Sequence, residues 1–169
     1  MLGTRLERWG LALALALAPA PAAAQVSEAA VKAAYLYKMA AFVTWPPNAF
    51  ASASAPFRIC VLNRTDVAGP LSELAHGAQA WGRPVVISVI GGSQEASQCQ
   101  ILFLGDGHAA LGDSAPVLTV TEHGASSPGV VEFTVQQSHV RFVIHRSQAD
   151  ARRLQISSKL LAVAAAVVP

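Results

Sequence analysis

The sequence is poor in cysteine and in charged side chains. Its 169 residues include two cysteines, and Asp, Glu, Lys and Arg together make up 13% of the chain. The formal net charge is +2, and the only adjacent basic pair is Arg152 and Arg153. Because binding to nucleic-acid phosphates needs clustered Lys and Arg, this composition argues against a nucleic-acid partner. The high apolar fraction, 53%, predicts that some apolar surface is left for another kind of partner.

The sequence also lacks the motifs of three large enzyme classes. A dinucleotide-binding fold needs a Gly-rich turn after its first strand, but here Leu62 is followed by Asn63-Arg64-Thr65-Asp66. No Walker A sequence and no G-x-S-x-G elbow occurs in the chain. We therefore predict that the protein is not an enzyme and expect neither catalytic residues nor a cofactor.

The first residues have the features of a cleavable export signal. Arg5 and Arg8 precede a short apolar stretch, which prolines and a run of small residues follow. This arrangement is typical of a signal peptide that is cut after Ala24. A membrane anchor is the weaker alternative, because the stretch is shorter than the roughly 20 residues that cross a bilayer. We expect residues 1–24 to be removed and residues 25–169 to form one exported domain.

Both cysteines, Cys60 and Cys99, lie after this signal. In an oxidising compartment they are expected to form one disulfide, and two buried free thiols are the alternative. Closure of such a loop would remove about 4 kcal/mol of unfolded-state entropy. A zinc site is disfavoured because no second cysteine or histidine motif completes four ligands, so no metal is predicted.

Hydrophobic patterns predict a mixed α/β fold. Residues 27–45 contain neither Pro nor Gly and are predicted to form a helix with Ser27 as its N-cap. The prolines after Trp45 end this helix. The residues at helical spacing in this stretch are Val31, Ala34, Tyr35, Lys38, Ala41 and Phe42.

Four continuous apolar runs predict strands that are buried on both faces, as in a parallel sheet. The runs are Phe57–Leu62, Pro84–Ile90, Gln100–Leu104 and Pro116–Val120. Between the first two, residues 66–80 place Leu71, Leu74 and Ala78 at helical spacing. The order strand, helix, strand is typical of a βαβ unit.

The last third of the chain has a different pattern. Residues 130–136 and 139–145 alternate apolar and polar side chains around Gln137-Ser138, which predicts a β-hairpin. Its core-facing side chains are expected to be Phe133, Val135, Val140, Phe142 and Ile144. Residues 150–168 are predicted to form a closing helix that is apolar nearly all round. The main stripe of this helix consists of Ile156, Leu160, Val163 and Val167.

Polar residues at the carboxyl ends of the parallel strands are candidates for binding a small ligand, because open α/β sheets place ligands there. The candidates are Asn63, Arg64, Asp106, His108, Glu122 and His123. The two carboxylate–histidine pairs among them have the residue types of acid–base pairs, but no nucleophile accompanies them. A ligand pocket is therefore favoured over catalysis, and ordinary polar loop tips are the alternative.

Several motifs together resemble the YfiR family. The string Val31–Tyr37, followed by Phe42-Val43 and Trp45-Pro46, is similar to the opening motif of that family. Further segments fall in the family's order, namely Arg58–Leu62, Cys99–Leu104, Val117–Val120, Arg141-Phe142 and Ile156–Leu161. The sequence departs from the family at His145, where relatives often carry Asn, and at Ser127–Gly129, which replaces a more glycine-rich segment.

This resemblance implies a three-layer, Rossmann-like α/β sandwich that is often dimeric. It implies a periplasmic repressor that binds the periplasmic sensor domain of an inner-membrane diguanylate cyclase, which lowers cyclic di-GMP and biofilm formation. An OmpA-like outer-membrane lipoprotein and a second copy of the chain are further expected partners. A disulfide is also a feature of the family.

The residues expected to contact the cyclase lie at the end of the first helix and in the last helix. They are Tyr37, Trp45, Leu160, Leu161 and Val168, for which core packing is the alternative. A periplasmic small-molecule sensor that uses the loops after the strands is the second functional hypothesis. An envelope enzyme is the third, and no motif supports it.

Overall fold

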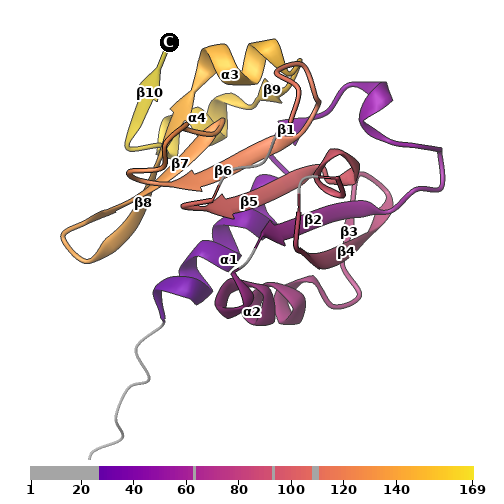
Figure 1. Cartoon of the computed structure of the whole chain (residues 1–169), viewed down its shortest axis with the longest axis horizontal. Coiled ribbons are helices and arrows are strands. Elements are labelled where there is room, and N and C mark those ends of the chain that lie inside the picture. The colour runs from indigo at the N-terminus through magenta and orange to yellow at the C-terminus, as the bar shows by residue number, and fades with distance from the viewer. Residues whose placement is uncertain (1–26, 63, 93, 108–110) are drawn as a thin grey trace, which may run out of the picture.

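An eight-stranded, mostly parallel sheet forms the centre of the structure (Figure 1). The computed structural model describes residues 27–62, 64–92, 94–107 and 111–169, so the predicted signal peptide lies outside the described residues. The strands of the sheet are β2 (Phe57–Leu62), β3 (Gln79–Ala80), β4 (Arg83–Ile90), β5 (Ile101–Gly105), β6 (Leu118–Glu122), β7 (Val131–Gln136), β8 (His139–His145) and β10 (Ala166–Val168). Their spatial order is β10-β8-β7-β6-β5-β2-β4-β3.

Strand directions confirm the predicted parallel sheet and hairpin. Strands β4, β2, β5, β6 and β7 run parallel to one another, whereas β3 is antiparallel to β4 and β8 is antiparallel to β7. The hairpin turn has φ +49° at Gln137 and +62° at Ser138, as a type I′ turn requires. The ranges predicted for β2 and β8 are confirmed to the residue, and the other predicted strands agree within two residues at each end.

Two helices, α1 (Glu28–Met39) and α2 (Thr65–Ala75), cover one face of the sheet (Figure 1). The Ser27 hydroxyl accepts a hydrogen bond from the Ala30 N–H at 3.1 Å, which confirms the predicted N-cap. Beneath α1, Tyr35 packs edge-on against Phe142 with 5.4 Å between ring centroids. The helix-covered face is therefore a dry aromatic and aliphatic core.

The residues noted at helical spacing are not the most buried ones of their helices. In α1 the buried residues are Lys32, Ala33, Leu36 and Met39, because α1 packs against the sheet and α2 together. In α2, Leu71 is buried, whereas Leu74 is 46% exposed.

Two strand predictions also need correction. Strand β4 is not buried on both faces: Val89 is 53% exposed, because only the two-residue β3 continues the sheet beyond it. Val135 was expected in the core but is 54% exposed, since it lies near the tip of the β7–β8 hairpin. The other four side chains predicted to face the core from this hairpin are buried.

The single closing helix predicted for residues 150–168 is wrong. This part of the chain forms the end of α3 (Arg146–Ala151), β9 (Gln155–Ile156), α4 (Ser158–Val163) and β10. Arg153 has φ +57°, a left-handed conformation that interrupts the helix after α3. Ser157 then caps α4, its hydroxyl accepting from the Leu160 N–H at 3.3 Å. The final valines extend as β10 because the edge of β8 is free to pair with them.

Short segments connect the two ends of the described chain. Helix α1 ends at Met39, before the predicted end, because Val43 and Thr44 form β1 (Val43–Thr44), which pairs antiparallel with β9. The 3₁₀ turns are η1 (Pro47–Ala49) and η2 (Ala96–Gln98). None of the helices within the described ranges combines the length and hydrophobicity that a membrane crossing needs. The mixed α/β class is confirmed, whereas the finer three-layer, Rossmann-like description stays a prediction.

Candidate functional site

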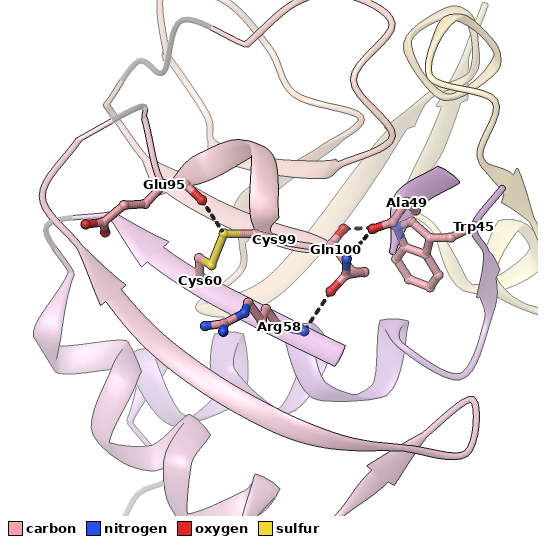
Figure 2. The surroundings of a disulfide bond; sticks show 7 residues. All are labelled: Trp45, Ala49, Arg58, Cys60, Glu95, Cys99 and Gln100. Carbon is pink, nitrogen blue, oxygen red and sulfur yellow. Dashed lines mark hydrogen bonds between the residues drawn. A yellow bond between two sulfur atoms is a disulfide. The ribbon is translucent and has the colours of Figure 1, made fainter. Parts of the chain in front are cut away.

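The predicted disulfide is present between Cys60 and Cys99 (Figure 2). Cys60 lies within β2, and Cys99 follows η2 and precedes β5, so the bond joins positions 39 residues apart. Both cysteines belong to a second apolar cluster with Leu102 and Leu104 of β5. The disulfide thus closes the face of the sheet opposite α1 and α2.

The residue after the disulfide, Gln100, connects several segments through buried hydrogen bonds (Figure 2). Its side-chain Oε1 accepts from the Arg58 backbone N–H at 2.7 Å, and its Nε2 donates to the Ala49 carbonyl at 2.6 Å. Its own carbonyl accepts from the Trp45 indole N–H at 3.0 Å. Trp45 is therefore positioned inside the protein, where only 7% of it is exposed.

A network of charges lies at the carboxyl ends of β2 and β6. Glu122 accepts a hydrogen bond from Lys32 Nζ of α1 at 2.9 Å and one from Arg64 Nη1. Arg64 also donates through Nε and Nη2 to both oxygens of Asp66, each at 3.0 Å. Lys32 forms a second ion pair with Glu28, one helical turn earlier, at 2.5 Å. Each charge in this network has an opposite partner, so the network ties α1 and α2 to the sheet rather than presenting a free base.

The pKa shifts in this network agree with its geometry. Burial alone would raise the pKa of Glu122, but the hydrogen bonds from Lys32 and Arg64 outweigh it and hold the pKa below its ordinary value. The hydrogen bonds to Asp66 raise the pKa of Arg64 despite the effect of burial. These carboxylates therefore remain ionised at neutral pH and are poor candidates for a general base.

Gly105 lets the Arg64 side chain reach this position. Gly105 has φ +60°, and a Cβ built there would come within 3.2 Å of Arg64 Cγ. The Arg64 guanidinium lies 5.6 Å from the centre of the Phe103 ring. A side chain at position 105 would thus strain the left-handed backbone and require the Arg64 side chain to shift.

A second polar group lies on the opposite face of the sheet. Glu132 of β7 contacts His123 Nδ1 at 2.6 Å through one oxygen and His145 Nε2 at 3.2 Å through the other. Its strand neighbour Phe133 points into the helix-covered core, so alternation directs Glu132 away from the helices. Within the described ranges, no group of three or more His, Cys, Asp or Glu side chains has the arrangement of a metal site.

The carboxy-terminal segments expose apolar side chains. Val163 of α4 is 61% exposed, and Val167 and Val168 of β10 are 42% and 39% exposed. Strand β10 is at one end of the strand order, and among the described residues it pairs only with β8, which leaves its outer edge unpaired there. We call these three valines, of which Val167 and Val168 lie on opposite faces of β10, together with the unpaired edge, the C-terminal surface.

Comparison with protein families decides the relationship that the sequence motifs suggested. The family model described as YfiR/HmsC-like matches residues 29–165. The chain belongs to the YfiR/HmsC-like family. No curated protein matches the chain. Membership of this family favours a regulatory role over a catalytic one.

Of the predicted ligand residues, the structure of this YfiR/HmsC-like protein describes Arg64, Asp106, Glu122 and His123. Asn63 and His108 lie outside the described residues, and Asp106 is an exposed residue after β5. Glu122 and Arg64 contact each other, as their position at the strand ends predicts. His123, although adjacent in sequence, contacts Glu132 on the other face. The sequence did not identify Lys32 as a member of this charge network, because its partner Glu122 lies 90 residues away. The i, i+4 spacing of Glu28 and Lys32 was the one local sign of an ion pair there.

The residues predicted to contact a partner are also distributed over different parts of the structure. Trp45 and Leu160 are buried at 7% and 5% exposure, so they belong to the protein's own core. Tyr37 and Leu161 are half-buried, and Tyr37 lines a pocket with β3, at the end of the strand order opposite to β10. Val168 lies on the C-terminal surface. Val163 and Val167 were expected in the stripe of the closing helix, and their exposure was not predicted.

Proposed function

We propose that this protein acts in the periplasm, where it binds and represses the sensor domain of an inner-membrane diguanylate cyclase. Its family membership supports a regulatory role in this pathway, and its disulfide suits an oxidising compartment. Removal of residues 1–24 as a signal peptide would deliver residues 25–169 as one domain. Repression would lower cyclic di-GMP and with it biofilm formation.

The observation that carries the proposal is the C-terminal surface in a member of a regulatory family. Exposed valines offer apolar area that is removed from water on binding, at about 25 cal/mol per Å². The free edge of β10 offers backbone N–H and C=O groups to which an extended partner segment can add as a further strand. We place the contact with the cyclase sensor at this surface.

Repression would work through a shift in population. A ligand that binds the inactive conformation of the sensor more tightly than the active one stabilises the inactive state by that difference in affinity. A switch from mostly active to mostly inactive needs a difference of about 5.5 kcal/mol. The contact must therefore change with the conformation of the sensor and cannot be equally tight in both states.

A binding measurement with two purified proteins tests the proposal. The oxidised mature protein is titrated against the periplasmic domain of a diguanylate cyclase from the same genome. The double variant Val163→Lys/Val167→Lys is expected to bind at least about tenfold more weakly, because two charges would be buried at the contact. Val135→Lys is the matched control, since Val135 is equally apolar and is 54% exposed on the β7–β8 hairpin. Failure of the unmodified protein to bind any such sensor domain would argue against repression by contact.

The other expected partners need measurements of their own. A second copy of the chain at the C-terminal surface would give a dimer that the double variant loses, and an OmpA-like outer-membrane lipoprotein would bind in a separate assay. The ligand-sensor alternative at the carboxyl ends of the strands is less well supported. There Arg64 and Glu122 are already paired with each other and with Asp66 and Lys32.

A further inference from the structure

Arg152 is buried with an incomplete set of hydrogen-bond partners. The residue follows α3, and 7% of it is exposed. Its Nη1 donates to the backbone carbonyls of Gly112 at 3.3 Å and Ala115 at 3.1 Å. Its Nε is also buried, and among the described residues it has no acceptor. A buried N–H without an acceptor is destabilising, so this position favours an acceptor from outside the chain.

The Arg152 side chain lines a cavity of about 110 Å³. Thr119 of β6 forms part of the wall, on the face of the sheet opposite α1 and α2. The turn that precedes β7 closes another side and is fixed to β6: the Gly129 N–H donates to Thr121 Oγ1 at 3.0 Å. A Cβ at Gly129 would lie 2.6 Å from the Thr119 carbonyl, so only glycine allows this close approach. The wall of the cavity is therefore held in place by specific contacts, and the cavity has room for a few heavy atoms.

The free groups of Arg152 select the chemistry of the ligand. Nη1 already donates to two carbonyls, and Nη2 makes no hydrogen bond within the described part of the chain. The edge formed by Nε and Nη2 is therefore the part of the guanidinium that can bind a ligand. This edge presents two parallel N–H groups, which match the two oxygens of a carboxylate. The Ser127 and Gln148 side chains also line the cavity and offer hydrogen bonds to further polar atoms.

A nearby carboxylate limits the charge of the ligand. Asp113 is an exposed residue that lines the same cavity, and it forms no ion pair with Arg152 within 4.0 Å among the described residues. Burial lowers the pKa of Arg152, and the charge of Asp113 acts in the opposite direction. Arg152 attracts a negatively charged ligand and Asp113 repels it, and this repulsion grows with the charge of the ligand, so one negative charge is favoured over two.

We propose that this cavity binds a small monocarboxylate, whose carboxylate is held by the Nε and Nη2 edge of Arg152. The site lies apart from the C-terminal surface and does not depend on the proposed function. Of the ligand residues predicted at the strand ends, the four that the structure describes, Arg64, Asp106, Glu122 and His123, do not line this cavity.

Nuclear magnetic resonance of the oxidised mature protein tests the proposal directly. The Arg152 Nε–H signal is followed during titrations with acetate and with lactate, with chloride as the control at matched pH and ionic strength. We expect a saturable shift with either carboxylate, and a rise in Tm of about 4 °C at tenfold the fitted Kd. Shifts no larger than those with chloride would overturn the proposal. A saturable shift with inorganic phosphate alone would overturn the assignment to a monocarboxylate.

Variants test the placement of the ligand. Arg152→Met should abolish the rise in Tm; if it does not fold, Asp113→Asn provides the second test. Removal of the Asp113 charge is expected to tighten acetate binding about threefold, because the repulsion disappears. Asp150→Asn is the matched control, since Asp150 is an exposed carboxylate on α3 outside the cavity. If Asp113→Asn binds acetate no more tightly than Asp150→Asn, the proposed placement is wrong.

Discussion

The half of the sheet around β2 and β5 is held very differently from the edge formed by β8 and β10. In the first region a disulfide, the hydrogen bonds of Gln100 and the Glu122 ion pairs connect segments that are far apart in sequence. The edge has a three-residue strand, one partner strand and exposed valines. The difference indicates that the first region is cross-connected, whereas the edge exposes the apolar surface that we propose for binding. We call the first region the clamped half.

Removal of the disulfide should have the largest effect on this contrast. The double variant Cys60→Ala/Cys99→Ala is expected to lose about 4 kcal/mol of unfolding free energy, because a loop of 39 residues is no longer closed in the unfolded state. Urea unfolding with and without a reductant measures the loss, and the variant itself should not respond to the reductant. A loss below about 1 kcal/mol would mean that the clamped half does not depend on this bond.

Replacement of Gln100 should have the next largest effect. Gln100→Leu leaves the Arg58 N–H and the Ala49 carbonyl without their side-chain partner, which should cost roughly 3 kcal/mol. Gln98→Leu is the control, since Gln98 is exposed in η2 and its replacement should change stability by less than about 0.5 kcal/mol. Equal unfolding midpoints for the two variants would contradict the role of Gln100.

The Glu122 network should give a smaller effect that depends on pH. Glu122 has a lowered pKa in the folded protein, so it stabilises the fold above its unfolded pKa, and this contribution disappears as the pH falls through the lowered value. Glu122→Gln should cost about 1 kcal/mol at pH 7 and should flatten the loss of stability below about pH 5. Asp106→Asn, at an exposed carboxylate, is the control. A parallel pH dependence in unmodified protein and Glu122→Gln would show that the network contributes nothing.

The smallest change in stability is expected at the edge. Val163→Lys/Val167→Lys should alter the unfolding free energy by no more than about 0.5 kcal/mol, because both side chains are already largely in water. Urea unfolding followed by circular dichroism measures the unfolding free energy, and Val135→Lys is measured in the same way as the control. A loss of several kcal/mol would mean that the valines pack in the fold, and the contrast between the two regions would no longer hold.

The sequence predicted the clamped half better than the edge, for physical reasons. Strand β2 was predicted to the residue because a continuous apolar run between loop residues suits only a buried strand, and the two cysteines allowed only one pairing. The closing helix was wrong because alanines and valines at helical spacing also fit a short strand, and pairing with β8 decides between them.

The candidate sites were harder to predict, because they depend on contacts between distant segments. The approach of Lys32 to Glu122 and the burial of Arg152 beside Gly112 leave no local pattern in the sequence. Residues adjacent in sequence can also belong to different groups, because Glu122 and His123 contact partners on opposite faces of the sheet. Exposure at Val163 and Val167 likewise follows from the break in the predicted helix.

The most direct test of the proposed role is the cellular concentration of cyclic di-GMP in a deletion strain. The strain is complemented with the full chain, with a form that lacks residues 1–24, with Val163→Lys/Val167→Lys and with Val135→Lys. Our account predicts a rise on deletion that the full chain and Val135→Lys reverse, whereas the form without a signal and the double variant do not. No rise on deletion, or full reversal by the double variant, would contradict repression through the C-terminal surface.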